Sequence, residues 1–173
     1  MTAGYTPVAK LLVDRGADIN AVDINQTSSL MLASLKGQAP IAKMLLGKGA
    51  DVNDKDKNGV TAMMFASDNG QRDAVKLLIT HKTDVNAASN TGTTPLMFAS
   101  TRGFTDIVQL LLQNKADVNA FTIKSIPVAV QGMSIGFPPG SSALHFARLR
   151  KNNVVEDLLL KAGAVQEPSM MKK

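Results

Sequence analysis

The segment Gly-Ala-Asp-Ile-Asn at residues 16–20 decides the fold, because close copies of it recur along the chain. The copies are Gly-Ala-Asp-Val-Asn at 49–53, Lys-Thr-Asp-Val-Asn at 82–86 and Lys-Ala-Asp-Val-Asn at 115–119, so the spacing is 33 residues three times in succession. A repeat of this length is a supersecondary unit that cannot bury its apolar face alone and is stabilised by stacking on its neighbours. The chain is therefore expected to form one elongated array.

The composition of the 173 residues is consistent with such an array and argues against several other classes. Hydrophobic residues make up 45% and there is no cysteine, which is too apolar for a disordered chain and excludes a disulfide framework. The formal net charge is +5, but the basic residues are spread along the chain without a stripe interleaved with aromatics, so we do not expect nucleic-acid binding. No apolar run approaches the roughly 18 residues of a membrane span, so no membrane association is expected.

Four of the units also carry a second motif, which predicts the start of a helix. Its first residue is Ser or Thr, whose side chain caps a helix N-terminus, and Pro95 suits a first turn that needs no N–H donor. An apolar pattern at helical spacing follows, such as Ile-Val-Gln-Leu-Leu-Leu at 107–112, and predicts a second helix. The motif reads Ser-Ser-Leu-Met-Leu-Ala at 28–33, Thr-Ala-Met-Met-Phe-Ala at 61–66, Thr-Pro-Leu-Met-Phe-Ala at 94–99 and Ser-Ala-Leu-His-Phe-Ala at 142–147.

These motifs resemble the ankyrin repeat, whose signature is Thr-Pro-Leu-His-x-Ala, then Gly, an Ile-Val-x-Leu-Leu-Leu helix and Gly-Ala-Asp-Val-Asn. The resemblance covers residues 4–165 and implies an all-α solenoid of stacked helix-turn-helix units with finger hairpins, about four full repeats plus an N-terminal half repeat. Its Met-rich and Ala-Ser-rich units look like those of bacterial ankyrin proteins. We divide the chain into a half repeat at 1–20, repeats at 21–53, 54–86, 87–119 and 120–165, and a C-terminal tail at 166–173.

Two departures from the family pattern concern the scaffold. Met31, Met64 and Met97 stand where the family has His, so we expect the inter-repeat hydrogen bonds of that His to be missing there, and His145 alone keeps the residue. Gln26 replaces the turn glycine of the other fingers, which predicts a less regular finger at this point.

The N-terminal unit aligns only with a second helix, because residues 4–13 match residues 37–46. One interpretation is a degenerate cap, and the other, which we favour, is that a first helix and a leader were removed. The compartment stays open: the chain as it stands predicts the cytoplasm, and removal of a leader predicts the periplasm.

One finger is longer than the others. Asn86 and Gly92 are six positions apart and the equivalent Asn119 and Gly140 are twenty-one apart, so fifteen residues are inserted within 121–139. The inserted segment is apolar, lacks acidic residues and is rich in Gly and Pro, and a long finger of this kind is commonly functional. It is expected to form a short strand or hairpin that covers the last two repeats, or to project into a partner's groove, and both can hold at once.

Two motifs imitate catalytic or metal chemistry. Gly-Met-Ser-Ile-Gly at 132–136 matches the elbow that holds a nucleophilic serine between a strand and a helix, but Phe-Pro-Pro-Gly follows it instead of a helix, so a hydrolase using Ser134 is only a remote alternative. Residues 54–59 imitate the first half of a calcium loop, yet Phe65 stands where its terminal Glu belongs. We therefore expect no catalytic residue, no cofactor and no metal.

Function is expected on the concave face formed by the fingers and the first helices. The sequence predicts a non-enzymatic module that is monomeric when free and binds another folded protein there, with the apolar insertion giving specificity. The alternative is a dedicated inhibitor or protective partner of a specific, exported bacterial enzyme, whose groove the inserted loop occludes. The predicted partner-binding residues are Val22, Ile24, Leu35, Lys36, Lys55, Lys57, Asn58, Asp68, Asn69, Asn90, Thr91, Thr101, Arg102, Phe121, Ile126, Val128, Met133, Ile135 and Phe137.

Overall fold

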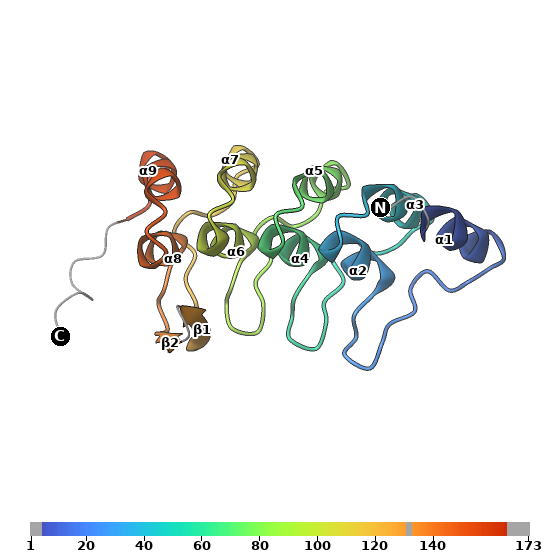
Figure 1. Ribbon diagram of the computed structural model, residues 1–173, viewed down its shortest axis with the longest axis horizontal. Helices are drawn as coiled ribbons and strands as arrows, with labels where there is room; N and C mark the ends of the chain where they lie inside the picture. The colour runs from blue at the N-terminus through green and yellow to red at the C-terminus, as the bar shows by residue number, and fades with distance from the viewer. Residues whose placement is uncertain (1–4, 131–132, 166–173) are drawn as a thin grey trace.

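The computed structural model describes residues 5–130 and 133–165, with the side chains of Tyr5 and of 127–137 left out. Its helices form two rows, with the fingers hanging below the first row (Figure 1). The predicted all-α solenoid of stacked helix-turn-helix units is thereby confirmed. The first row contains α2 (Ser29–Leu35), α4 (Ala62–Asp68), α6 (Pro95–Arg102) and α8 (Ala143–Leu149), and the second-helix row contains α1 (Tyr5–Asp14), α3 (Ala39–Gly47), α5 (Arg72–Thr80), α7 (Thr105–Gln113) and α9 (Asn153–Lys161).

The first helices begin where the sequence places a capping side chain. The Thr61 Oγ1 atom accepts a hydrogen bond from the Met64 N–H at 3.4 Å, which satisfies one of the orphan donors of helix α4. At α2 the exchange is reciprocal: Ser28 Oγ accepts from Met31 N–H, and Met31 Sδ accepts from Ser28 N–H, both at 3.4 Å. In α8 the Nδ1 atom of His145 accepts the equivalent backbone bond from Ser142, at 3.2 Å. The methionine sulfur thus replaces the imidazole in this local bond.

The core lies between the two rows and is built from the same positions in successive units. Each first helix packs on the next, as α2 on α4, α4 on α6 and α6 on α8, and each second helix packs on its own first helix and on the next second helix. In every unit that has both helices, a leucine at a fixed position of the second helix is buried. Burying one such side chain stabilises the fold by about 1.5–3 kcal/mol. These leucines are Leu45, Leu78, Leu111 and Leu159.

Helix α1 is the exception to this burial. It packs against α3, but Val8 and Leu12, which align with the buried Ile41 and Leu45, are 57% and 56% exposed. A groove of about 270 Å³ runs beside the helix and is lined by Leu12 together with Leu32 of α2. The groove lies where the first helix of a complete unit would pack.

Asparagine side chains bridge one unit to the next. The Oδ1 atom of Asn86 accepts a hydrogen bond from the backbone N–H of Asp117 at 2.7 Å, and its Nδ2 group donates to the Lys115 carbonyl at 3.2 Å. Asn53 accepts from Asp84 N–H at 2.9 Å in the same way. Adjacent units share these bonds, which explains why the Asp-Val-Asn motif recurs with the period of the stack.

The fingers are tight turns that hydrogen-bond to each other through their backbones. The N–H of Lys57 donates to the carbonyl of Asn25 at 2.9 Å, that of Asn90 to Asn58 at 2.8 Å, and that of Ile123 to Thr91 at 2.8 Å. The finger that contains Gln26 keeps the same form: Gln26 has φ +61°, close to the +74° of Gly59, and both residues donate their N–H to the aspartate three positions earlier at 2.9 Å. The expectation of a less regular finger is therefore wrong, because Gln26 adopts the left-handed backbone that the turn requires.

The inserted segment forms an antiparallel hairpin at the end of its finger, and the predicted strands are confirmed. Strand β1 (Ile126–Val130) pairs with β2 (Met133–Phe137) in the register Ile126↔Phe137, Val128↔Ile135 and Val130↔Met133. The insertion thus extends this finger by a two-stranded antiparallel ladder.

Candidate functional site

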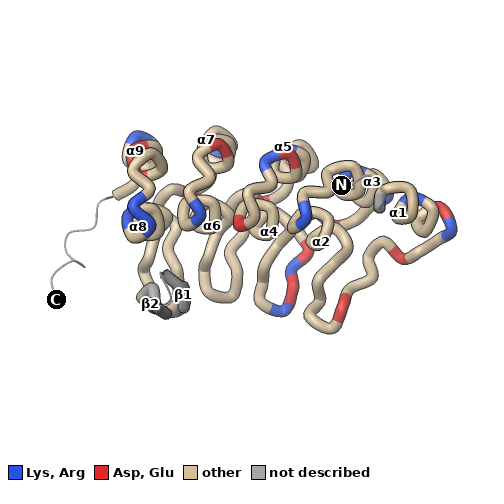
Figure 2. Tube along the Cα trace, in the orientation of Figure 1, with Lys and Arg blue, Asp and Glu red and all other residues tan. Residues whose placement is uncertain are grey.

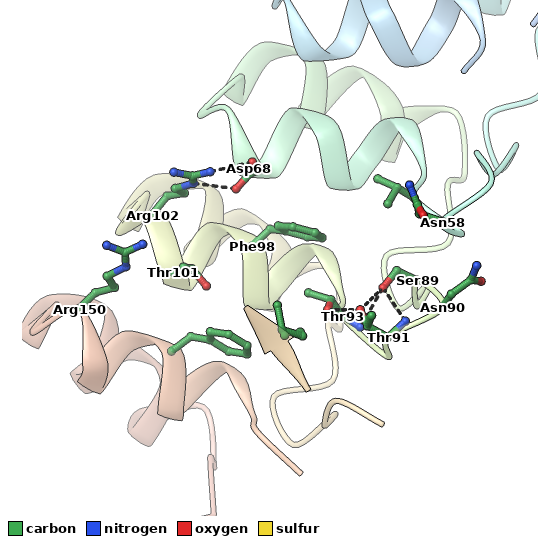
Figure 3. A pocket seen from close by; sticks show the side chains of 13 residues that line it. Asn58, Asp68, Ser89, Asn90, Thr91, Thr93, Phe98, Thr101, Arg102 and Arg150 are labelled. Carbon is green, nitrogen blue, oxygen red and sulfur yellow. Dashed lines mark hydrogen bonds and ion pairs between the residues drawn. The ribbon is translucent and has the colours of Figure 1, made fainter. Parts of the chain in front are cut away.

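A pocket of about 460 Å³ opens in the angle between the fingers and the first-helix row, where three units meet (Figure 3). Phe98 of α6 lies in its middle, with hydroxyl side chains toward the finger end and guanidinium groups toward the opposite end. Phe98 and Ile126 are half-buried and Phe146 is buried. We call the surface formed by the fingers and the first helices the finger face. The pocket is lined by Asn58, Val60, Asp68, Ser89, Asn90, Thr91, Thr93, Phe98, Thr101, Arg102, Ile126, Phe146 and Arg150.

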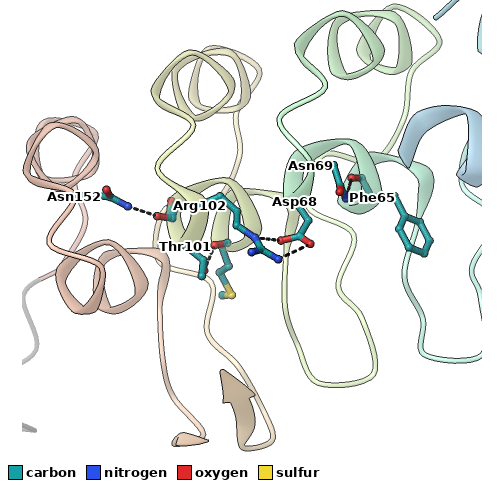
Figure 4. A network of polar contacts seen from close by, with 8 residues as sticks. Phe65, Asp68, Asn69, Thr101, Arg102 and Asn152 are labelled. Atoms are coloured by element: carbon teal, nitrogen blue, oxygen red, sulfur yellow. Dashed lines mark hydrogen bonds and ion pairs between the residues drawn. The ribbon is translucent and has the colours of Figure 1, made fainter. Parts of the chain in front are cut away.

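The charged end of the pocket contains an ion pair between two units. Arg102 Nε and Nη2 donate to the two carboxylate oxygens of Asp68 at 2.7 and 3.0 Å, a bidentate pair between α6 and α4 (Figure 4). This hydrogen bond raises the pKa of Arg102, so the guanidinium is charged at any physiological pH. Both side chains are partly exposed, and such a pair stabilises a fold by at most about 1 kcal/mol. Its main effect is to fix the direction of the guanidinium.

The helix residues around this pair are held by hydrogen bonds to backbone carbonyls. Thr101 Oγ1 donates to Met97 at 2.7 Å within α6, and Asn152 Nδ2 donates to Ser100 at 3.3 Å from the following unit (Figure 4). The bond from Asn152 and the Arg102–Asp68 pair connect the C-terminal end of α6 to both neighbouring units. The pocket therefore has a rigid wall on the first-helix side.

The finger end of the pocket is a chain of hydroxyl groups. The Oγ atom of Ser89 lies 2.9 Å from Thr91 Oγ1, which lies 2.8 Å from Thr93 Oγ1. Ser89 Oγ also accepts hydrogen bonds from the backbone N–H groups of Thr91 and Thr93, at 3.3 and 3.2 Å. The serine thus closes the finger turn and supplies a polar wall at the same time.

Aspartates perform the same closing role in the two preceding fingers. Asp56 Oδ1 accepts from the N–H groups of Asn58 and Val60, both at 2.8 Å, and Asp23 accepts equivalent bonds in its own finger. Backbone hydrogen bonds, that from Thr27 above all, lower the pKa of Asp23. Burial, together with the nearby Asp51, raises the pKa of Asp54. The two hydrogen bonds that Asp56 accepts identify it as a turn residue. The resemblance of residues 54–59 to a calcium loop thus follows from the geometry of the finger.

The pocket gathers seven of the predicted partner-binding residues. Eight others lie elsewhere, and Val22 and Ile24 are exposed on the finger that precedes α2. Val128, Met133, Ile135 and Phe137 are placed in the hairpin ladder, and their side chains lie outside the described residues. In the pocket are Asn58, Asp68, Asn90, Thr91, Thr101, Arg102 and Ile126, and away from it are Val22, Ile24, Leu35, Lys36, Lys55, Lys57, Asn69 and Phe121.

The predicted partner-binding set lacks six pocket residues, which are Val60, Ser89, Thr93, Phe98, Phe146 and Arg150. Phe98 and Phe146 share one position of the first-helix motif, and Arg150 aligns with Arg102, so the repeat alignment contained a signal for three of them. Ser89 could have been found as the residue that aligns with Asp23 and Asp56 but carries no charge. Each signal becomes visible only when units are compared at the same position.

The structure contradicts the serine-elbow alternative. Ser134 lies inside strand β2 and pairs with Ala129, whereas a nucleophile elbow places its serine at a sharp turn between a strand and a helix. In the described part of the chain, no helix is long and apolar enough to cross a bilayer. Over the same residues, no three His, Cys, Asp or Glu side chains cluster as metal ligands would.

Comparison with known families agrees with the architecture. A family model described as "Ankyrin repeats (3 copies)" matches residues 1–56 and 30–122. The two matches together cover more than half of the chain and stop before the hairpin, which begins at Ile126. Comparison with curated proteins gave no significant match. On the matched repeats and the stacked helix pairs, the chain belongs to the ankyrin repeat family.

Proposed function

We propose that this protein is a non-catalytic binding module that holds a folded protein partner on its finger face, with the hairpin conferring specificity. Ankyrin repeats are generally protein–protein interaction modules, which supports the general role. The observation that carries the specific proposal is the junction at Ile126. This residue begins strand β1 and also lines the pocket, so the hairpin and the pocket form one surface.

The exposed residues around this junction have the chemistry of an interface. Phe121 and Ile123, at the base of the hairpin, are 62% and 59% exposed. Aromatic and aliphatic anchors surrounded by polar groups are what dominates binding energy in protein interfaces. A standard interface buries about 800 Å² on each partner, so the proposal requires the partner to contact several fingers together with the hairpin.

A hairpin in place of a tight turn favours binding in which the protein inserts a segment into its partner. The other fingers reverse direction within a few residues, whereas this one extends by two strands of five residues each. Such an extension suits insertion into the groove of a partner. The inhibitor or protective role toward an enzyme is therefore the second candidate, and it predicts that the captured partner loses activity when bound.

The test is capture of partners from the native organism with a variant that lacks the hairpin. Deleting residues 124–138 and introducing Pro139→Asn restores the length of the other fingers and keeps the Ile123 N–H that bonds to Thr91. We expect the full chain to capture a partner and this variant to lose it. Lys76→Ala, on the exposed side of α5 in the second-helix row, is the matched control and should retain the partner. The proposal is contradicted if a partner binds the hairpin-deletion variant but does not bind the Lys76→Ala control.

A further inference from the structure

The fingers differ in charge at one structurally equivalent position. An oxygen at this position closes the turn by accepting two backbone hydrogen bonds, and Asp23 and Asp56 supply it as a carboxylate. Ser89 supplies it as a neutral hydroxyl with the same two bonds. The turn does not need the charge, so the exchange changes the electrostatics of the surface and not its shape. Residues 87–93 and the insertion at 121–139 contain no acidic residue, and Figure 2 shows the acidic residues of the fingers on those that precede α2 and α4.

The opposite end of the pocket is positive. Arg102 and Arg150 both line the pocket there, and Asp68 is the one acidic residue among the lining residues (Figure 3). A guanidinium has five N–H donors, and the pair with Asp68 involves the Nε and Nη2 groups of Arg102. Arg102 therefore retains donors for a second carboxylate.

The middle of the pocket is apolar. Its lining includes the half-buried Phe98 and Ile126 and the buried Phe146. A side chain that entered here would lie between the hydroxyl wall at Ser89 and the guanidinium groups. An apolar centre with a positive rim selects a complementary segment, because opposite charges favour the partner and like charges exclude it.

We infer that this pocket binds a segment of the partner protein in which an aromatic or branched aliphatic side chain is flanked by carboxylates. The apolar side chain occupies the space between Phe98 and Ile126, and a neighbouring carboxylate accepts hydrogen bonds from Arg102. Ser89 is the specificity-determining residue on the finger side, because an aspartate at its position would repel the segment. This inference rests on the proposed function and specifies the chemistry of the partner at that site.

The first experiment uses synthetic peptides and the full chain. Acetyl-Gly-Glu-Phe-Glu-Gly-amide is titrated while the backbone amides of Thr91, Thr101 and Arg102 are followed by NMR. We expect saturable shifts at these amides, with binding at least about 5-fold weaker for the matched Gln-Phe-Gln and Glu-Ala-Glu peptides, since each removes one part of the recognition. Equal binding of the Gln-Phe-Gln peptide, or no shift with any of the three peptides, overturns the inference.

Three variants separate recognition from a general effect on the fold. Ser89→Asp restores the carboxylate of the earlier fingers and should weaken binding of the Glu-Phe-Glu peptide about 5-fold, while the matched Asp23→Ser in a distant finger leaves it unchanged. Asp68→Asn removes the competing carboxylate and should strengthen binding about 3-fold. A Ser89→Asp variant that binds as tightly as the wild type, with an unchanged circular dichroism spectrum, contradicts the inference.

Partner capture distinguishes the two proposals. If the hairpin deletion abolishes capture and Ser89→Asp does not change it, the interaction surface stands and the acidic recognition is wrong. If Ser89→Asp reduces capture and the hairpin deletion does not, the pocket chemistry stands and the role of the hairpin is wrong.

Discussion

Helices α1 and α7 carry the same apolar pattern in different surroundings. Val8 and Leu12 of α1 align with Ile107 and Leu111 of α7, yet the first two are more than half exposed and the last two are completely buried. Helix α7 packs against α6 of its own unit and against α5 and α9, whereas α1 packs on α3 beside an open groove. The comparison teaches that an apolar stripe in a stacked array is buried by its neighbours and not by the helix that carries it.

The largest effect expected from this comparison is a difference between two leucine truncations. Leu111→Ala should lower the free energy of unfolding by about 3 kcal/mol, because it leaves a cavity among buried side chains. Leu12→Ala, at the aligned position, should lower it by less than about 1 kcal/mol, because its side chain is mostly in water. Urea unfolding followed by circular dichroism measures both. Equal losses would refute the dependence on neighbours.

A grafted first helix should abolish the difference. Replacing residues 1–3 by a copy of residues 58–69 places the sequence of α4 in front of Gly4, at the spacing found in the complete units. We expect stability to rise by about 2 kcal/mol, because Val8 and Leu12 become buried and the ordering of the added helix offsets part of the gain. The same graft with the copied Ala66 changed to Glu should give no gain. If both grafts stabilise equally, the groove beside α1 does not receive such a helix.

The two turn positions Gln26 and Gly59 extend the comparison to the fingers. Gly59→Gln should lower the free energy of unfolding by about 2 kcal/mol, because a Cβ atom there would meet the backbone N of Asn90 at 2.9 Å and the backbone is left-handed. Gln26→Gly should raise it by about 0.5–1 kcal/mol, because only the strain is removed. Thermal unfolding of both variants measures the two effects, and a loss of stability in Gln26→Gly would contradict this account.

The smallest effect is expected in the buried interface between the first helices. The Oγ atoms of Ser34, Ser67 and Ser100 are buried at one repeated position and have no hydrogen-bond partner within the described residues. Ser67→Ala should therefore leave stability unchanged or raise it by up to about 1 kcal/mol, since a buried hydroxyl without a partner is unfavourable. Urea unfolding gives the sign, and a loss above about 1 kcal/mol would mean that the hydroxyl has a partner.

The sequence predicted the scaffold because the fold depends on a short-range pattern that repeats. Copies of Asp-Val-Asn and of the Thr-Pro-Leu motif establish the helix pairs, and the asparagine bridges confirm why the spacing is constant. The same logic failed at Gln26, where bonds from neighbouring residues impose a backbone that the residue itself disfavours.

The pocket was only partly predictable because it is assembled from three units. The prediction placed Arg102 and Asp68 on the finger face but not in contact, since their bidentate pair depends on how α4 and α6 stack. Phe98 and Arg150 went unnoticed for a similar reason. They belong to different units and line the same pocket only because those units stack. The hairpin register likewise depends on pairing that alternation in the sequence does not specify.

The backbone bonds between successive fingers have a mechanical consequence. Lys57 is tied to Asn25, Asn90 to Asn58 and Ile123 to Thr91, so no tip in this series can be displaced without straining the next. We therefore expect the row of fingers to move as one unit and not as separate flexible loops. A partner that binds one finger contacts a preformed surface. The fingers therefore lose little conformational entropy when the partner binds.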